Sequence, residues 1–200
     1  MTLARAATRI EETTAHSTGG LVLDGPIRRS CAGSAGKVSY LEWGGRPGAT
    51  PLLFLHPVNT AAEIWVDLMD QLDRPAVAVD YRGHGRSDHR GPFLPTDFAA
   101  DAFAALDDAG LPRAVLVGGS IGGAVSVEMA HRSPEKVAGI ALFGAGLRFG
   151  IDTETLHALT TAMTELGPAE WFRSMSGDIL GPDAPTDVPA RIAQLAGGRP

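Results

Sequence analysis

The sequence has 200 residues, enough for one domain or for one domain with an appendage. Hydrophobic residues make up 44% of the chain and charged residues 20%, so a sizeable core can be buried and the composition is not that of a disordered protein. The formal net charge is −6 and Lys and Arg form no cluster, which argues against nucleic acid as a partner.

The sequence also lacks the features of a membrane or exported protein. No apolar run approaches the roughly 20 residues that span a bilayer. The first 20 residues have no apolar centre of the kind that signal peptides need, and we interpret them as a mobile polar tail. Cys31 is the single cysteine, so no intrachain disulfide can form. We therefore expect a soluble, cytoplasmic protein.

The chain begins its predicted folded part with an antiparallel hairpin of Ile27–Cys31 and Lys37–Trp43, joined by a turn rich in glycine. Four short, continuous apolar runs follow. Such runs are typical of strands that are buried on both faces, as in a parallel sheet. The four runs are Leu52–Leu55, Ala76–Val79, Ala114–Val117 and Val137–Phe143.

Helical periods separate these four runs. They predict helices over Ile64–Leu72 and Thr96–Asp108, with Thr96 or Asp97 as the N-cap of the second. A third helix starts at Ile121 and ends before Pro134. The hairpin and the alternation after it predict a three-layer α/β/α sandwich with a mostly parallel sheet over residues 21–150.

The alternation stops after Phe143. One apolar stripe at helical spacing runs from Leu156 to Leu166, and another joins Trp171, Met175 and Ile179. Two successive helices without a strand predict a helical lid over residues 151–200. A pair of peripheral packing helices is the alternative.

The strongest chemical signal is Gly118-Gly119-Ser120-Ile121-Gly122, which matches G-x-S-x-G between an apolar strand and a helix. In this strand–turn–helix arrangement the turn is so sharp that the serine backbone is strained, and larger side chains two residues away would collide with neighbouring elements. Ser120 is therefore the predicted nucleophile, and Gly118 and Gly122 are its elbow glycines. A dinucleotide-binding loop is excluded, because G-x-G-x-x-G fits in no register here.

Two further motifs follow the first two strands of the predicted parallel sheet. His56-Pro57 comes after Leu52–Leu55, and the segment Asp80 to Asp88 (DYRGHGRSD) comes after Ala76–Val79. With the serine motif, each at a strand end and in this order, they resemble the α/β-hydrolase superfamily, and more narrowly its branch of esterases, lactonases and carbon–carbon-bond hydrolases. The resemblance covers about residues 35 to 150.

This resemblance implies an oxyanion hole made of two backbone N–H groups. One comes from Val58, two residues after the His of the His-Pro turn, and the other from Ile121, directly after the nucleophile. Pro57 departs from the glycine that is commoner at its position, but it leaves the donor at Val58 in place. The resemblance implies no cofactor.

Other polar side chains near these motifs are interpreted as structural. His56 is expected to stabilise its turn rather than to act as a base. Asp80, Arg82, His84 and Asp88 resemble a metal cluster in composition but lack zinc-type spacing, and the family uses this loop as a hydrogen-bonded scaffold. We therefore expect no metal site.

The remaining members of a catalytic triad are not evident. In this fold an acid and then a histidine follow the serine, yet only His131 and His157 come after Ser120. His131 lies late in the helix that starts at the nucleophile, and His157 lies in the predicted lid. We therefore expect the acid and the base beyond Pro200. Truncation before the last strands of the fold is the simplest account, and completion by a second chain is an alternative.

The function expected is that of a serine hydrolase that cleaves an ester, a lactone or a related small carbonyl compound through an acyl-enzyme. Two alternatives stay open. The absent base favours an inactive fragment or a small-ligand-binding module, and a cofactor-free haloperoxidase or perhydrolase would use the same constellation. The sequence does not indicate an oligomeric state.

Overall fold

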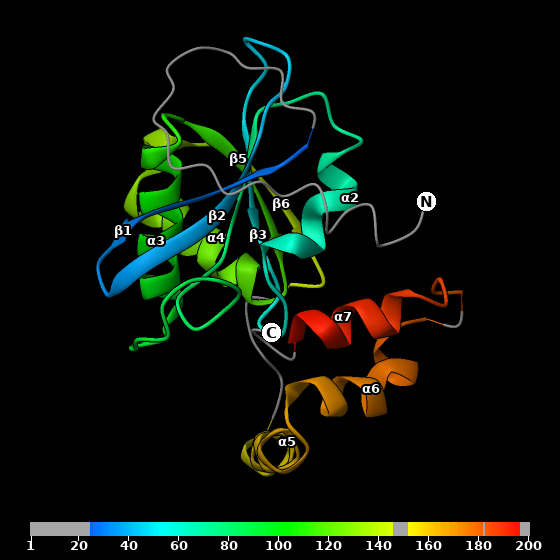
Figure 1. Ribbon diagram of the computed structural model, residues 1–200. Coiled ribbons are helices and arrows are strands. Elements are labelled where there is room, and N and C mark those ends of the chain that lie inside the picture. The colour runs from blue at the N-terminus through cyan, green and yellow to red at the C-terminus, as the bar shows by residue number, and fades with distance from the viewer. Residues whose placement is uncertain (1–24, 146–151, 182, 197–200) are drawn as a thin grey trace. The chain divides into compact units, whose positions relative to one another are not determined.

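The computed structural model describes residues 25–145, 152–181 and 183–196, in two compact units that divide between Ala145 and Gly146 (Figure 1). We describe each unit by itself. The first unit holds the sheet, and the second consists of helices. The sequence placed this division near residue 150, and the polar tail that it predicted over residues 1–20 lies outside the described residues.

The first unit contains one six-stranded, mostly parallel sheet in the order β1-β2-β4-β3-β5-β6. Both β1 and β4 pair antiparallel with β2, whereas β4, β3, β5 and β6 run parallel to one another. The predicted hairpin and all four predicted parallel strands are therefore confirmed, and β6 forms one edge of the sheet among the described strands. The strands are β1 (Ile27–Gly33), β2 (Gly36–Trp43), β3 (Leu52–Leu55), β4 (Ala76–Val79), β5 (Ala114–Gly119) and β6 (Val137–Phe143).

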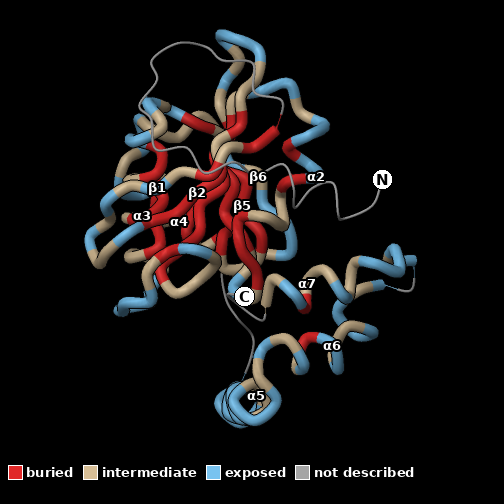
Figure 2. Tube along the Cα trace, viewed as in Figure 1, coloured by how far each residue is buried: buried red, intermediate tan, exposed pale blue. Residues whose placement is uncertain are grey.

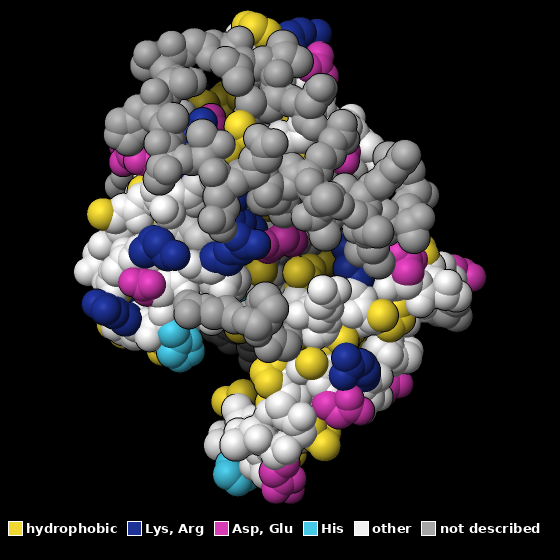
Figure 3. Space-filling view, in the orientation of Figure 1, with side chains coloured by type: hydrophobic (Ala, Val, Ile, Leu, Met, Phe, Trp, Pro, Cys, Tyr) yellow, Lys and Arg dark blue, Asp and Glu magenta, His cyan; other side chains and the backbone are white. Residues whose placement is uncertain are grey.

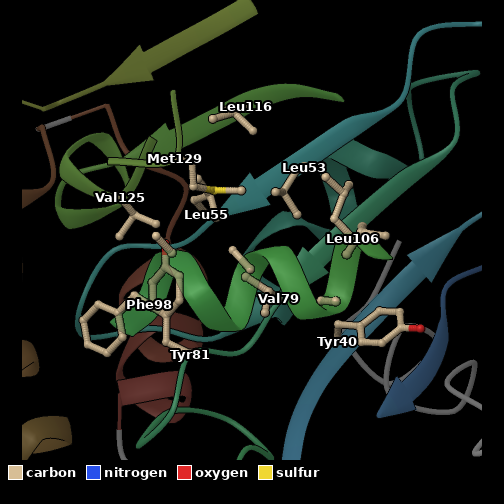
Figure 4. Close-up of a cluster of buried hydrophobic side chains, with 14 of the residues drawn as sticks. Tyr40, Leu53, Leu55, Val79, Tyr81, Phe98, Leu106, Leu116, Val125 and Met129 are labelled. Carbon is tan, nitrogen blue, oxygen red and sulfur yellow. The ribbon is translucent and has the colours of Figure 1, made fainter. Parts of the chain in front are cut away.

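Every residue of β3 and β4 is buried, because both faces of the sheet are covered. Figure 2 shows the buried residues of the first unit gathered in the strands at its centre. On one face Leu53 and Leu55 pack with α3 (Pro95–Asp108) and α4 (Ile121–Arg132), in the cluster that Figure 4 shows. On the other face Phe54 packs with the 3₁₀ turn η1 (Ala62–Trp65) and the short helix α2 (Val66–Met69). The two-fold alternation of side chains along a strand thus divides continuous apolar runs between two cores.

Two predicted helices differ from the observed ones. The helix expected over Ile64–Leu72 is a 3₁₀ turn followed by a single α-helical turn that ends at Met69. Its start is fixed by the Asp80 carboxylate, which accepts a hydrogen bond of 2.8 Å from the Ala62 N–H. The chain then turns toward Pro75, and a residue that precedes proline disfavours helical backbone.

The N-cap predicted for the next helix is also wrong. The cap of α3 is Leu94 in extended conformation, with Pro95 as the first helical residue, rather than Thr96 or Asp97. Pro95 fits there because its missing N–H has no partner in the first turn of a helix. Asp97 still contributes, because its carboxylate accepts a hydrogen bond of 3.0 Å from the Leu94 N–H.

The second unit contains three helices in its described part, one more than predicted. They are α5 (Thr153–Leu166), α6 (Pro168–Ile179) and α7 (Val188–Ala196). The third could have been found from the helical spacing of Val188, Ile192 and Leu195. Within the described part of this unit only Phe172 and Ala193 are buried hydrophobic residues.

Candidate active site

Ser120 lies between β5 and α4 and has a strained backbone, with φ 52° and ψ −115°. Among the described residues it is the only one other than glycine that has a positive φ. The neighbouring strand β6 helps to hold Ser120, because the Ser120 N–H donates a hydrogen bond of 3.1 Å to the Phe143 carbonyl. Non-glycine residues adopt such backbone only where surrounding structure imposes it, and these residues cluster at functional sites.

The elbow glycines have no room for a side chain. A Cβ on Gly118 would lie 2.5 Å from the Gly122 carbonyl oxygen, and a Cβ on Gly122 would lie 2.2 Å from the Leu55 carbonyl oxygen. The Ser126 hydroxyl supports the turn from inside α4, since it donates a hydrogen bond of 2.7 Å to the Gly122 carbonyl. The first turn of α4 is thus pressed against the end of β3.

The loop after β3 lies beside the serine. Strands β3 and β5 are parallel neighbours with Leu55 opposite Gly118, so the residues that follow each strand emerge at the same edge of the sheet. Pro57 lies against the serine turn, because a Cβ on Gly119 would be only 3.2 Å from its Cγ. The two residues expected to form the oxyanion hole, Val58 and Ile121, therefore both belong to segments that leave the sheet at this edge.

His56 is fully buried under this loop, and both of its ring nitrogens have partners. Its Nε2 accepts a hydrogen bond of 3.4 Å from the Tyr81 N–H, so Nδ1 carries the proton and donates it to the Pro57 carbonyl at 2.8 Å. Burial, with the nearby His84 as a second cause, lowers the pKa of His56 to about 4. This neutral side chain agrees with the structural role expected from the sequence.

The turn after β4 is held together by the fully buried Asp80. Its carboxylate accepts hydrogen bonds from the Arg28 guanidinium at 2.8 Å and from the Arg86 N–H at 3.1 Å, in addition to the Ala62 N–H. Gly85 approaches it so closely that a Cβ there would lie 2.3 Å from a carboxylate oxygen. Asp80 therefore acts as a hydrogen-bonded scaffold, as the family resemblance implied.

A second buried ion pair links the same turn to α3. The Arg82 guanidinium forms a two-pronged contact with the Asp101 carboxylate, at 2.8 Å from Nε and 2.7 Å from Nη2. Paired hydrogen bonds of this kind are strong and fix the orientation of both groups. Asp88, from the end of the turn, accepts a hydrogen bond of 3.0 Å from the Lys37 N–H of β2.

Sequence reasoning missed Arg28 and Asp101, the partners of this scaffold. A signal for Asp101 was available, because it shares one face of α3 with the buried Phe98, Ala102 and Ala105. A lone carboxylate on an apolar helix face predicts a buried cation opposite it.

Two described histidines follow Ser120 in the chain, and the structure assigns neither of them as its base. His131 is exposed in the last turn of α4, eleven residues along the helix from the nucleophile. His157 is an exposed residue of α5 in the second unit. The structure thus assembles the nucleophile turn and the loop beside it, while the triad acid and histidine stay predictions.

The chain belongs to the α/β-hydrolase family, because the family model described as the alpha/beta hydrolase fold matches residues 50–193. The lipase LipV of Mycobacterium tuberculosis is 31% identical over 159 residues, which are 76% of this chain and 58% of the lipase. An esterase of the same organism is 31% identical over 122 residues, covering 60% of this chain and 40% of the esterase.

Solved structures show the same fold. Est816, described as an N-acyl homoserine lactone degrading enzyme, has a TM-score of 0.67 and 25% identity, and the match covers 84% of this chain and 64% of that one. This chain spans about half the length of the curated relatives named above. The family therefore gives the class of protein to which the chain belongs.

The lengths of the helices and the distribution of surface charge bear on membranes and nucleic acid as partners. None of the helices in the described ranges is long and apolar enough to cross a membrane. On the face that Figure 3 shows, basic and acidic side chains of the described residues are interspersed rather than gathered into one basic patch.

Proposed function

We propose that the protein is a serine hydrolase that cleaves an ester, a lactone or a related small carbonyl compound. The observation that carries this proposal is the backbone of Ser120, which keeps a positive φ of 52° between two glycines that cannot be replaced without a clash. A strained serine at a strand–helix turn has its hydroxyl presented above the sheet, where a substrate carbonyl can approach. The lipase and the esterase among the relatives favour the same class of substrate.

The chemistry proceeds in two steps. The Ser120 hydroxyl oxygen attacks the carbonyl carbon, and the alkoxide that develops on the carbonyl oxygen accepts hydrogen bonds from the backbone N–H groups of Val58 and Ile121. The N-terminus of α4 adds a favourable dipole at the same place. Collapse of the tetrahedral intermediate expels the alcohol, and water then hydrolyses the acyl group from Ser120.

The base that accepts the Ser120 proton is proposed to come from residues that follow Pro200, together with the acid that orients it. The order of this fold places both after the lid. In the first unit, His56 and His84 each have both ring nitrogens within hydrogen-bond distance of backbone groups, so neither is available as the base.

The test is steady-state hydrolysis of short-chain aryl esters and of lactones by the protein at its natural length. We expect turnover that falls by at least about 10³-fold in Ser120→Ala, because the nucleophile is lost while the fold is kept. Circular dichroism checks that the variant is folded. Equal activity in Ser120→Ala would overturn the proposal, and so would a fully folded protein with no turnover of any ester or lactone.

A further inference from the structure

The loop beside Ser120 contains a tight turn whose conformation is specific. The Thr60 N–H donates a hydrogen bond of 3.1 Å to the Pro57 carbonyl and closes a β-turn with Val58 and Asn59 at its centre. Neither central residue has a positive φ. A type II turn requires a positive φ at its third residue, here Asn59, so this turn is not type II and the type I form fits it.

Type I and type II turns differ by a flip of the central peptide, which here joins Val58 to Asn59. Asparagine tolerates the left-handed backbone that the flip would impose at the third position. The sequence of the turn therefore leaves both forms accessible, and something outside the turn selects between them.

His84 contacts the group that the flip would move. Its ring Nε2 lies 2.6 Å from the Val58 carbonyl oxygen, which is the oxygen of the central peptide, and its Nδ1 lies 3.1 Å from the Arg82 carbonyl oxygen. A carbonyl oxygen can only accept, and the contact of Nε2 is the shorter of the two, so we assign a proton to Nε2, which donates it to Val58. A flipped peptide would turn this carbonyl away and break the hydrogen bond.

His84 is itself held in place. Its N–H donates a hydrogen bond of 2.9 Å to the Tyr81 carbonyl, and glycines at positive φ flank it on both sides. Its ring lies among those of His56, Phe98 and Tyr81, at centroid distances of 5.1, 5.9 and 6.0 Å. The donor to Val58 is thus part of a fixed framework rather than a mobile surface side chain.

We propose that His84 is a positioning residue that holds the Pro57–Thr60 turn in its type I form and so fixes the peptide that follows Val58. His56 and Thr60 hold the peptide that precedes Val58 through the Pro57 carbonyl, and His84 holds the peptide that follows it. The Val58 N–H belongs to the preceding peptide and keeps its place in a flip, but the flipped Val58 carbonyl oxygen would lie on the same side as this N–H and would oppose the negative charge of the oxyanion. This catalytic consequence rests on the proposed function, in which the Val58 N–H stabilises the oxyanion. The control of the turn by His84 does not rest on it.

Two substitutions distinguish the contact that Nε2 makes with Val58 from the contact that Nδ1 makes with Arg82. In His84→Gln the side-chain amide reaches the position of Nε2 and keeps a donor for Val58. In His84→Asn the amide lies near the position of Nδ1 and keeps only the contact with Arg82. By NMR, a flipped turn shows a strong nuclear Overhauser effect between the Val58 Hα and the Asn59 amide proton. We expect this signal in His84→Asn and not in His84→Gln or the unaltered protein, and an unflipped turn in His84→Asn would overturn the proposal.

A measurement on the unaltered protein guards against a variant that fails to fold. The ¹⁵N resonances of the His84 ring should show a protonated Nε2, and an unprotonated Nε2 would overturn the proposal. Asn59→Thr supplies a rescue, because a β-branched residue disfavours positive φ. Added to His84→Asn, it should restore the unflipped turn.

Ester hydrolysis tests the catalytic consequence. We expect His84→Asn to lower kcat at least about tenfold with KM changed less than about twofold, and His84→Gln and the double variant with Asn59→Thr to recover most of the loss. A flipped turn with unchanged kcat would overturn the link to catalysis. If the unaltered protein hydrolyses no ester, the proposed function fails, and the NMR results still decide whether His84 holds the turn.

Discussion

Gly122 and Gly119 both neighbour Ser120, yet the space around them differs. A Cβ on Gly122 would lie 2.2 Å from the backbone oxygen of Leu55, whereas the nearest neighbour of a Cβ on Gly119 would be the side chain of Pro57, at 3.2 Å. Backbone cannot yield without moving β3, so we expect Gly122→Ala to destabilise the protein by about 1–3 kcal/mol, as overpacking does. Gly119→Ala should destabilise the protein less, since a small shift of the Pro57 ring relieves the contact with the added Cβ.

Denaturant unfolding measures both variants, and Gly177→Ala is the control. Gly177 lies in α6 with no atom within 4 Å of an added Cβ, so alanine should stabilise the helix there by about 0.5–1 kcal/mol. Equal effects of alanine at 119 and 122 would show that the turn is not as tightly packed as the structure indicates.

The pKa of His56 makes stability depend on pH. In the folded protein this pKa is lowered to about 4, whereas in the unfolded chain histidine titrates near pH 6.5. As the pH falls below about 6.5 the unfolded chain binds a proton that the folded protein does not, so His56 contributes a loss of stability that continues until about pH 4 and totals about 3 kcal/mol.

The variant His56→Asn isolates this contribution, because asparagine keeps a donor for the Pro57 carbonyl and does not titrate. The free energy of unfolding of the unaltered protein should fall toward that of the variant as the pH is lowered from 7 to 5. A constant difference between the two proteins over this range would show that His56 is not held neutral.

At the scale of elements, the Arg82–Asp101 pair joins the turn after β4 to α3. Both side chains are buried, and Asp101→Ala leaves the guanidinium with only the more distant Asp97 carboxylate at 3.6 Å, so we expect a loss toward the lower end of about 3–5 kcal/mol. The control is Asp107→Ala, which breaks the pair with Lys136 on the exposed side of the same helix and should cost less than about 1 kcal/mol. Thermal and denaturant unfolding compare them, and similar losses would contradict the structural role of the Arg82–Asp101 pair.

The elements most fully predicted from the sequence are those with a simple pattern. Strands buried on both faces appear as continuous apolar runs, and Leu52–Leu55 and Ala76–Val79 were predicted to the residue. The predicted start of α3 was wrong because the cap residue Leu94 has no polar side chain to signal it, and the Asp97 carboxylate bonds to its backbone N–H instead. The helix Val188–Ala196 was missed although its apolar residues keep helical spacing.

The residues of the candidate site also differ in how far the sequence predicts them. Ser120 and its glycines form a local motif, so sequence alone indicated them, and Val58 was indicated only through the family resemblance. The contacts that shape the site were out of reach, because Arg28 is 52 residues from Asp80 and His84 is 26 residues from Val58. Such pairs are set by the register of the sheet, which a single sequence does not reveal.

On the scale of the whole molecule, the two units differ in how much apolar surface they bury. Strands β3 and β4 are buried throughout, whereas no described residue of α5 is buried. Few buried contacts allow local opening at a low free energy. Native-state hydrogen exchange should therefore show amides of α5 opening at a lower free energy than those of β3 and β4. Equal protection in both units would contradict this expectation.

The central claim is that Ser120 is an activated nucleophile, and covalent labelling tests it most directly. The protein at its natural length is incubated with a fluorophosphonate, digested and mapped by mass spectrometry. We predict one phosphonate adduct, on Ser120, with none on the buried Ser126 six residues along α4 and none in Ser120→Ala. An unlabelled Ser120 in the folded protein, or equal labelling of other serines, would contradict the account.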